Sequence, residues 1–458
     1  AVQTTGASSE HCLWNANSML ASVGQLEGSA GGAHRVRRLD RPSRYNVNRC
    51  CRRQRPASHT RMRTSVMPPA LYALAVATFA IGTTEFVVVG LIPGIAADLS
   101  VSLASAGLLV SLYALSITLG TPIFSALTGS LPRRELAIGL MVVFTACNLC
   151  AALAPGYGTL LLSRIVMAVA HGVFFGVGAA CATSLVSRSR SGGAVAVMMG
   201  GLTIAMVIGV PLGSWIGQLF NWRTPFFIVA GMGTVAVISL IRLLPHEIRY
   251  QAPAPFLMQL SLLGNRRLAT MYLVTAIGFG SSFVVFTFLS PLLTDVTGVR
   301  QETVNIALLL FGAATVVGNL SGGMLSGALG TRKAMLLLLC GLIISFALIP
   351  VAVHNEAAIF ATITVWGVFA FAIPPVMQAG VVAAAQQVAP DALATASGFN
   401  IAAFNLGISS GSFLGGVLLR DAGLLTTPYA SIAMAAGAFL IVAFALQPQP
   451  AITNAKAK

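Results

Sequence analysis

The sequence predicts an all-α membrane protein with twelve transmembrane helices, arranged as two six-helix repeats. Three observations lead to this fold class: an apolar composition, a series of long apolar runs, and an internal repeat with one recurring spacing. Of the 458 residues, 56% are hydrophobic and only 9% are charged. So few charged side chains do not cover the surface of a soluble protein of this length, and lipid must therefore be the main solvent.

The apolar runs begin near Pro69, and each is about 20 residues or longer. A helix of that length crosses the ~30 Å hydrocarbon core of a bilayer. The runs leave only short loops and no room for a soluble catalytic domain. We expect twelve helices, centred near Ala80, Leu115, Val143, Val173, Ile208, Val235, Val284, Val317, Gly341, Phe369, Asn405 and Gly437.

Lysine and arginine in the expected loops fall mostly on one side of the membrane. Cytoplasmic loops are rich in these residues, so the bias predicts that both chain ends are cytoplasmic. The cytoplasmic side holds Arg133, Arg134, Arg188, Arg190, Arg242, Arg249, Arg266, Arg267, Arg332, Lys333, Lys456 and Lys458, and the other side holds Arg223, Arg300 and Arg420. The excess of basic residues in these loops is thus topological. Without a continuous basic face, we expect no nucleic-acid partner.

Residues 1–66 form a different kind of sequence, with eleven arginines against three acids and no hydrophobic periodicity. They lack the continuous apolar region of a signal peptide. We interpret this basic, disordered extension as no part of the working protein, with the natural start at Met67 or Met62. The alternatives are a basic arm attracted to anionic lipid and a cleaved organellar transit sequence.

Cysteines give no sign of a metal or redox site. Cys147 and Cys150 form a C-x-x-C pattern, but it lies in the middle of the third expected helix. A zinc or redox motif needs an accessible, polar setting. We therefore expect these cysteines to pack as small apolar residues, and we expect no metal and no cofactor.

The membrane domain contains an internal repeat. In the fifth and eleventh helices, GVPLGSWIG and GISSGSFLG share G-x-x-x-G-S-x-x-G at an offset of 198 residues. The same offset aligns Gly82 with Gly280, Pro93 with Pro291, Gly120 with Gly318, Gly129 with Gly327, Leu131 with Leu329 and Arg134 with Arg332. A single recurring spacing indicates duplication. We expect six-helix bundles at 67–244 and 266–447, a central cytoplasmic loop at 245–265 and a tail at 448–458.

Two parallel six-helix halves joined by a cytoplasmic loop are the arrangement of the major facilitator transporters, and local motifs strengthen the resemblance. SALTGSLPRRELAIG resembles the family's loop between helices two and three, LLLSRIVMAVAHG its fourth-helix motif, and GGLTIAMVIGVPLGSWIG its antiporter motif. NWRTPF matches the start of the sixth helix. GTTEFVVVGLIPGIAADL is similar to the first helix of the drug:proton antiporter branch, especially arabinose-efflux-permease-like members. The resemblance covers about residues 67–446.

The resemblance implies gating or motif roles for eight residues: Gly129, Arg133, Arg134, Gly209, Pro211, Gly213, Arg332 and Lys333. The chain departs from the family pattern at several of these places. Gly129 stands where the family's loop has an aspartate, Pro132 replaces the loop glycine, and Val210 separates Gly209 from Pro211. Any role of the family's loop aspartate therefore does not carry over to this chain. The alternative for the basic motif residues is that they serve only to orient the chain in the membrane. We expect the glycines to permit close helix approach.

Glu85 is an acid deep in the first expected helix. Its repeat partner at the 198 offset is Phe283, so the fold itself does not require an acid there. Arg164 lies in the fourth helix at a similar depth, ~10–12 Å below the outer face. These two are the only Asp, Glu, Lys or Arg residues that we place well inside spans. His171 lies seven residues after Arg164, on the same face of the fourth helix and about 10 Å deeper in the membrane. The family pattern often has glutamine at this position.

We expect Glu85, Arg164 and His171 to couple transport to protons. Burial favours a neutral glutamate and a nearby arginine favours a charged one, so their balance permits proton exchange. Intramembrane ionisable groups are usually functional, and histidine is suited to proton relay. The alternatives are a permanent Glu85–Arg164 pair that fastens two helices, and a His171 that only hydrogen-bonds to a neighbouring helix.

Other polar and aromatic residues in the spans are candidates for substrate binding, because drug-sized ligands bind in apolar sites with a few polar groups. The same residue types also pack against lipid or other helices. The candidates are Tyr113, Phe174, Phe175, Phe283, Phe286, Trp366, Gln378, Asn400 and Asn405.

The resemblance implies a proton-coupled secondary transporter that exports drug-like or sugar-like small organic molecules by alternating access. We expect it to act as a monomer in a bacterial inner membrane, with a small organic substrate, protons and the lipid bilayer as its partners. The alternatives are a symporter that imports a sugar or nucleoside and, more remotely, a polytopic membrane enzyme. An ATP-driven pump is excluded because the chain has no G-x-x-x-x-G-K-[ST] loop.

Overall fold

The structure is a computed structural model that describes residues 67–187, 190–246, 248 and 261–446. The expectations for residues 1–66, for most of the central loop and for the tail lie outside these residues. Every regular element in the described part is helical. Eleven helices are long and apolar enough to cross a membrane, and one of them has 52 residues and contains a break. The prediction of twelve spans is therefore confirmed.

The first six spans follow one another with short connections. The fifth is composite, because a single π-helical turn interrupts it. The elements are α2 (Pro69–Asp98), α3 (Leu103–Leu127), α4 (Arg133–Ala152), α5 (Tyr157–Ser184), α6 (Ser191–Ile204), the π turn η3 (Ala205–Gly209), α7 (Val210–Leu219) and α8 (Thr224–Leu243).

The second six spans begin after the 3₁₀ turn η4 (Ser261–Gly264). The seventh span is α10 (Arg266–Phe286), continued by α11 (Leu289–Pro291) and the π turn η5 (Leu292–Val296). The others are α12 (Gln301–Ala352), α13 (Glu356–Val388), α14 (Leu393–Ala422) and α15 (Thr427–Phe444), with the 3₁₀ turns η6 (Pro390–Ala392) and η7 (Leu424–Thr426) before α14 and α15.

Helix α12 contains two spans, the eighth and the ninth. Gly330 inside it has φ 72° and ψ 161°, which is not a helical conformation. Only glycine adopts a positive φ of this kind without steric cost. The chain therefore reverses between these two spans at one residue, without a separate loop.

Glycine stripes join helices within each set of six. A Cβ at Gly407 would lie 2.3 Å from the carbonyl oxygen of Ala276, so α14 and α10 touch backbone to backbone. The stripe Gly407, Gly411 and Gly415 faces Ala276, Gly280 and Val284; in the first six spans Gly209, Gly213 and Gly217 face Thr83, Val87 and Leu91. The two glycine stripes correspond at the 198-residue offset. Gly209 and Gly213 thus make the close helix contacts expected of them.

The end of α2 is fastened to two other spans by Asp98. Its carboxylate accepts hydrogen bonds from Trp222 Nε1 at 2.9 Å and from Arg223 Nη1 at 2.5 Å. Arg223 also donates to the carbonyl oxygen of Ala154 at 3.2 Å. The Trp-Arg pair at the start of α8 therefore ties the ends of α2, α4 and α8 together.

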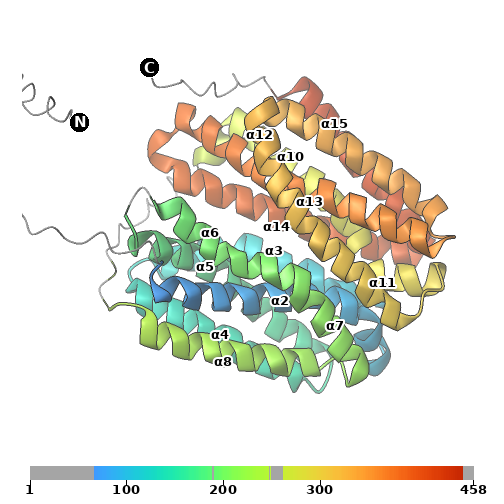
Figure 1. Ribbon diagram of the computed structural model, residues 1–458, viewed down its shortest axis with the longest axis horizontal. Coiled ribbons are helices and arrows are strands. Elements are labelled where there is room, and N and C mark those ends of the chain that lie inside the picture. Colours follow the sequence, from blue (N-terminus) through green and yellow to red (C-terminus); the bar gives the residue numbers. More distant parts are fainter. Residues whose placement is uncertain (1–66, 188–189, 247, 249–260, 447–458) are drawn as a thin grey trace, which may run out of the picture. The chain divides into compact units, whose positions relative to one another are not determined.

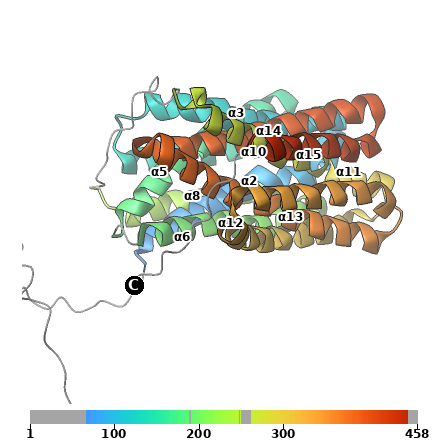
Figure 2. The same ribbon diagram turned by 90° about the horizontal axis from the view of Figure 1, so that it is seen from above.

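Figure 1 shows the first six spans, blue to green, on one side of the membrane domain and the later ones, yellow to red, on the other. Figure 2 shows that the helices of both sets run in roughly the same direction. The two sets meet where α3 packs against α14, and where η3 and α7 pack against α12. A Cβ at Gly312 would lie 2.3 Å from the carbonyl oxygen of Met206, so the contact between the fifth and eighth spans is close.

A reciprocal pair of carboxamides also joins the two sets. Asn305 Nδ2 donates to Gln218 Oε1 at 2.7 Å, and Gln218 Nε2 donates to Asn305 Oδ1 at 3.3 Å. Gln218 is near the last turn of α7 and Asn305 is in the second turn of α12. The pair therefore joins the two sets at the end of the membrane domain at which α2 also ends.

Candidate functional site

Arg164 is fully buried on α5, and main-chain oxygens surround its guanidinium group. Nη1 donates to the carbonyl oxygen of Thr84 at 2.7 Å, and Nη2 donates to that of Glu85 at 3.4 Å. Nε and Nη2 both lie 3.4 Å from the carbonyl oxygen of Leu109 on α3. The arginine therefore ties α5 to α2 and α3 through their backbones.

Glu85 lies beside Arg164, but the two side chains do not form an ion pair. In the described part of the chain the ion pairs are Asp98–Arg223 and Arg420–Asp421. Glu85 is half-buried in a stretch of α2 whose neighbouring residues are buried. Its carboxylate has no hydrogen bond to any described residue and is not sealed from water. The two residues that the sequence places at similar depth therefore lie side by side, but Arg164 contacts the main-chain oxygen of Glu85 and not its carboxylate.

Tyr113 and His171 extend this cluster along α3 and α5. The guanidinium carbon of Arg164 lies 4.2 Å from the centre of the Tyr113 ring, a cation–π contact. A 3.0 Å hydrogen bond joins Tyr113 Oη to His171 Nδ1. The His171 ring lies 4.8 Å from that of Phe175. Tyr113 is therefore held between the arginine and the histidine and is almost completely buried.

Asn148 is a site neighbour that sequence reasoning missed. It is fully buried on α4, where its Oδ1 accepts a 2.6 Å hydrogen bond from the hydroxyl of Thr84. Its Nδ2 donates to the carbonyl oxygen of Phe144. Thr84 is thus held by Asn148 through its side chain and by Arg164 through its main chain. This arrangement fixes the turn of α2 that carries Glu85.

The aromatic candidates of the second six spans form one buried cluster. Trp366 on α13 is completely buried, and its Nε1 donates to the hydroxyl of Ser282 at 3.1 Å. Phe311 stacks on Phe286 with ring centres 4.5 Å apart and meets Trp366 edge-on. Phe283 joins this cluster and reaches Phe86 of α2 at 6.4 Å. Phe174 on α5 is also buried.

The three amide candidates lie on α13 and α14. Asn400 is fully buried; it accepts a 2.8 Å hydrogen bond from Thr275 and donates to Gln378 Oε1 at 2.7 Å. Gln378 in turn donates to the hydroxyl of Ser397. These bonds link three helices. Asn405 is separate: its Nδ2 donates to a main-chain oxygen of α14, and its Oδ1 is buried without a partner among the described residues.

The motif arginines of the two halves have equivalent partners. Arg134 donates to the carbonyl oxygens of Leu244 at 2.9 Å and Ile241 at 2.7 Å, at the end of α8. Arg332 donates to those of Val442 at 3.3 Å and Ala443 at 2.7 Å, at the end of α15. Each arginine thus satisfies terminal carbonyl groups that a helix leaves without partners.

The other motif residues lie at turns and breaks. Gly129 is in the turn before α4, where Arg133 is the first helical residue, and Lys333 is exposed on α12. Val210 follows directly on the π turn η3, and Pro211 is the second residue of α7. Because a π turn holds one residue more than an α turn, it accommodates the additional Val210 while Gly209 and Gly213 stay on one stripe.

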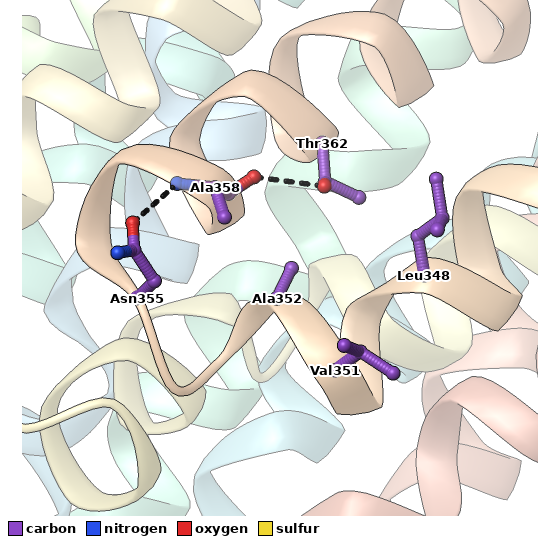
Figure 3. A pocket seen from close by; sticks show the side chains of 6 residues that line it. All are labelled: Leu348, Val351, Ala352, Asn355, Ala358 and Thr362. Carbon is purple, nitrogen blue, oxygen red and sulfur yellow. Dashed lines mark hydrogen bonds between the residues drawn. The ribbon is translucent and has the colours of Figure 1, made fainter.

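A surface hollow lies at the junction of α12 and α13, apart from the charged cluster (Figure 3). Its lining has no ionisable side chain. Asn355 and Thr362 are both hydrogen-bonded to the main chain of Ala358 at the start of α13. Val351 at its edge is 73% exposed. The hollow therefore belongs to the apolar outer surface. The residues that line it are Leu348, Val351, Ala352, Asn355, Ala358 and Thr362. Among the described residues no group of His, Cys, Asp and Glu is arranged to hold a metal ion.

Comparison with known proteins agrees with this architecture. The family model of the Major Facilitator Superfamily matches residues 74–377 and 271–458. The chain is 42% identical over 373 residues to the MFS-type transporter YtbD of Bacillus subtilis, covering 81% of this chain and 94% of YtbD. It is 33% identical over 382 residues to a chloramphenicol resistance protein of Streptomyces lividans, covering 82% and 95% respectively.

Among solved structures, the nucleoside transporter NupG has the same fold, with a TM-score of 0.67 at 16% identity, covering 82% of this chain and 98% of that one. The family match and the MFS-type relatives therefore indicate a transporter and not an enzyme. The chain belongs to the major facilitator superfamily.

Proposed function

We propose that the protein is a proton-coupled exporter of small organic molecules and that Glu85 is its proton-binding residue. The observation that carries the proposal is the unpaired, partly accessible carboxyl group of Glu85 inside a membrane span. A charged group at this depth is costly and is retained where it has a function. Since main-chain oxygens hold Arg164, the carboxyl group is able to gain and lose a proton without breaking an ion pair.

Export is favoured over uptake by the relatives, one of which is a chloramphenicol resistance protein. The substrate class we propose is an amphiphilic organic molecule, because the candidate residues of the second six spans combine three aromatic side chains with three amides. Substrate and proton compete for the site, and alternation of the two halves converts this competition into antiport. We also propose an inner-membrane location with cytoplasmic ends, following the bias of basic residues, and a monomeric transporter.

Inverted membrane vesicles test the proposal. A pH-gradient dye is read while amphiphilic drugs, sugars and nucleosides are added to vesicles with the wild type, with Glu85→Gln, or with Glu356→Gln. Glu356 is an exposed acid in the first turn of α13 and serves as the matched control. We expect an amphiphilic compound to dissipate the gradient in the wild type and the control but not in Glu85→Gln.

Two results would contradict the proposal. If Glu85→Gln still couples as well as the wild type, Glu85 is not the proton site. If right-side-out vesicles accumulate a sugar or nucleoside with protons, in a way that depends on Glu85, the protein is a symporter and the proposed direction is wrong.

A further inference from the structure

His171 has two ring nitrogens in different environments. Nδ1 is bound to the hydroxyl of Tyr113 at 3.0 Å. Nε2 has no hydrogen bond to any described residue, yet it is not among the buried polar atoms that lack a partner. The small exposed fraction of this residue, 7%, therefore includes Nε2. One nitrogen is bound by the protein, and the other has no partner among the described residues.

The position of Arg164 determines the direction of the Tyr113–His171 hydrogen bond. Its guanidinium group lies over the face of the Tyr113 ring, 4.2 Å from the centre. A positive charge there withdraws electron density from the phenol, which makes the hydroxyl a stronger donor and a weaker acceptor. Because the partner of one imidazole nitrogen decides which nitrogen carries the proton, Tyr113 donates to Nδ1 and the ring proton is on Nε2. This assignment follows from the hydrogen-bond network.

The charges around the ring favour a neutral histidine. Tyr113 on α3 is hydrogen-bonded to the His171 ring, and Arg164 on the same helix as His171 lies over the face of the Tyr113 ring. Glu85 on α2 lies beside Arg164. A protonated ring would add a second positive charge beside a buried arginine. It would also present a proton on Nδ1 to the hydroxyl hydrogen of Tyr113, so one of the two donors would lose its acceptor.

We propose that His171 is a fixed, neutral hydrogen-bond donor that binds an uncharged acceptor oxygen of the substrate through Nε2–H. The matching substrate group is a carbonyl, nitro or ether oxygen next to an apolar portion, which Phe175 contacts at the side of the imidazole. Tyr113 and Arg164 are positioning residues for this donor. The inference rests on the proposed transport function of the same site, and it assigns His171 to specificity instead of proton relay.

Nitrogen-15 NMR of the full chain with labelled histidines tests the donor directly, without a known substrate. The His171 signal is identified by its loss in His171→Gln. We expect a neutral ring with the proton on Nε2 from about pH 5.5 to about pH 8.5, the range in which ordinary histidines change charge. In Tyr113→Phe, which lacks the hydroxyl donor, we expect a mixture of both tautomers. A ring that becomes doubly protonated in this range, or that carries its proton on Nδ1, overturns the proposal.

Transport kinetics in vesicles separate a donor from a proton carrier. His171→Gln keeps an amide N–H at similar reach but does not titrate, so we expect proton movement per transported substrate to be kept and KM to rise less than in His171→Leu. His171→Leu has no donor, so KM for an acceptor-bearing substrate should rise about tenfold, the effect of one neutral hydrogen bond. Its kcat and its proton movement per substrate should change little. If His171→Gln transports substrate without moving protons, the histidine is a carrier and the proposal is wrong.

The two proposals fail in different ways. If Glu85 is not the proton site, the vesicle assay of Glu85→Gln reveals it, while the NMR result for His171 is unaffected. If His171 titrates, the coupling measured for Glu85→Gln still stands.

Discussion

Removing the guanidinium group of Arg332 should destabilise the second half of the transporter, whereas removing its neighbouring charge should not. Arg332 makes two hydrogen bonds to the last carbonyl groups of α15, at 3.3 and 2.7 Å. Lys333 carries the same charge at the next position but is exposed. The pair Arg332→Ala and Lys333→Ala therefore separates helix capping from loop charge.

The size of the effect follows from the two hydrogen bonds. A hydrogen bond from a charged donor contributes about 1.5–3 kcal/mol when buried, and the favourable position at a helix C-terminus adds about 0.3–1 kcal/mol. Because Arg332 is half-buried and one of its bonds is long, at 3.3 Å, we count only the 2.7 Å bond and take the lower ends. The expected loss in the free energy of unfolding is then about 2 kcal/mol. For a six-helix half such as residues 266–446, this loss lowers the midpoint temperature of thermal unfolding by about 5 °C.

Thermal unfolding of purified protein in detergent, followed by tryptophan fluorescence, measures this change. Arg134→Ala should behave like Arg332→Ala, because Arg134 makes the equivalent bonds at the end of α8. Arg332→Lys should restore little, since a single ammonium group does not span two carbonyls as the planar guanidinium does. Equal shifts for Arg332→Ala and Lys333→Ala would refute the capping argument and return these residues to a purely topological role.

Three further predictions concern helix contacts. Gly407→Ala should lower the free energy of unfolding by about 1–3 kcal/mol, because its Cβ would lie 2.3 Å from a carbonyl oxygen of α10. Gly437→Ala, where a Cβ would have nothing within 4 Å, should be neutral or stabilising. Thermal unfolding of both variants in detergent compares them. Gln218→Ala breaks the carboxamide pair with Asn305, so deuterium uptake at the start of α12 should rise several-fold; unchanged uptake would show that the pair does not hold this end closed. Asp98→Ala removes the acceptor of an arginine and a tryptophan and should lower stability by about 1 kcal/mol in the same melting experiment, given its partial exposure.

The fold could be predicted from the sequence because the bilayer imposes a simple rule on it. Apolar runs of sufficient length indicate spans regardless of their neighbours. The repeat offset then paired the spans of the two halves. Two details escaped this reasoning: the single-residue reversal at Gly330 and the π turn before Val210. Both depend on backbone conformation, which hydrophobicity does not report.

The candidate site could be predicted in part. Charge inside a span drew attention to Glu85 and Arg164, and helical rise placed them at similar depth. Depth does not specify the rotation of a helix or the reach of a long side chain. The sequence therefore gave no sign that Arg164 binds main-chain oxygens. Asn148 was missed because a neutral amide in a span is common and carries no charge signal.

The main-chain anchoring of Arg164 has a consequence for how this transporter changes over evolutionary time. Every residue type at positions 84 and 85 supplies a carbonyl oxygen, so the partners of the arginine survive any substitution there that keeps α2 helical. A lineage is then free to lose the acid, move it or exchange it without first replacing the arginine. Such a separation of scaffold from chemistry lets related transporters change the chemistry of this site by single mutations.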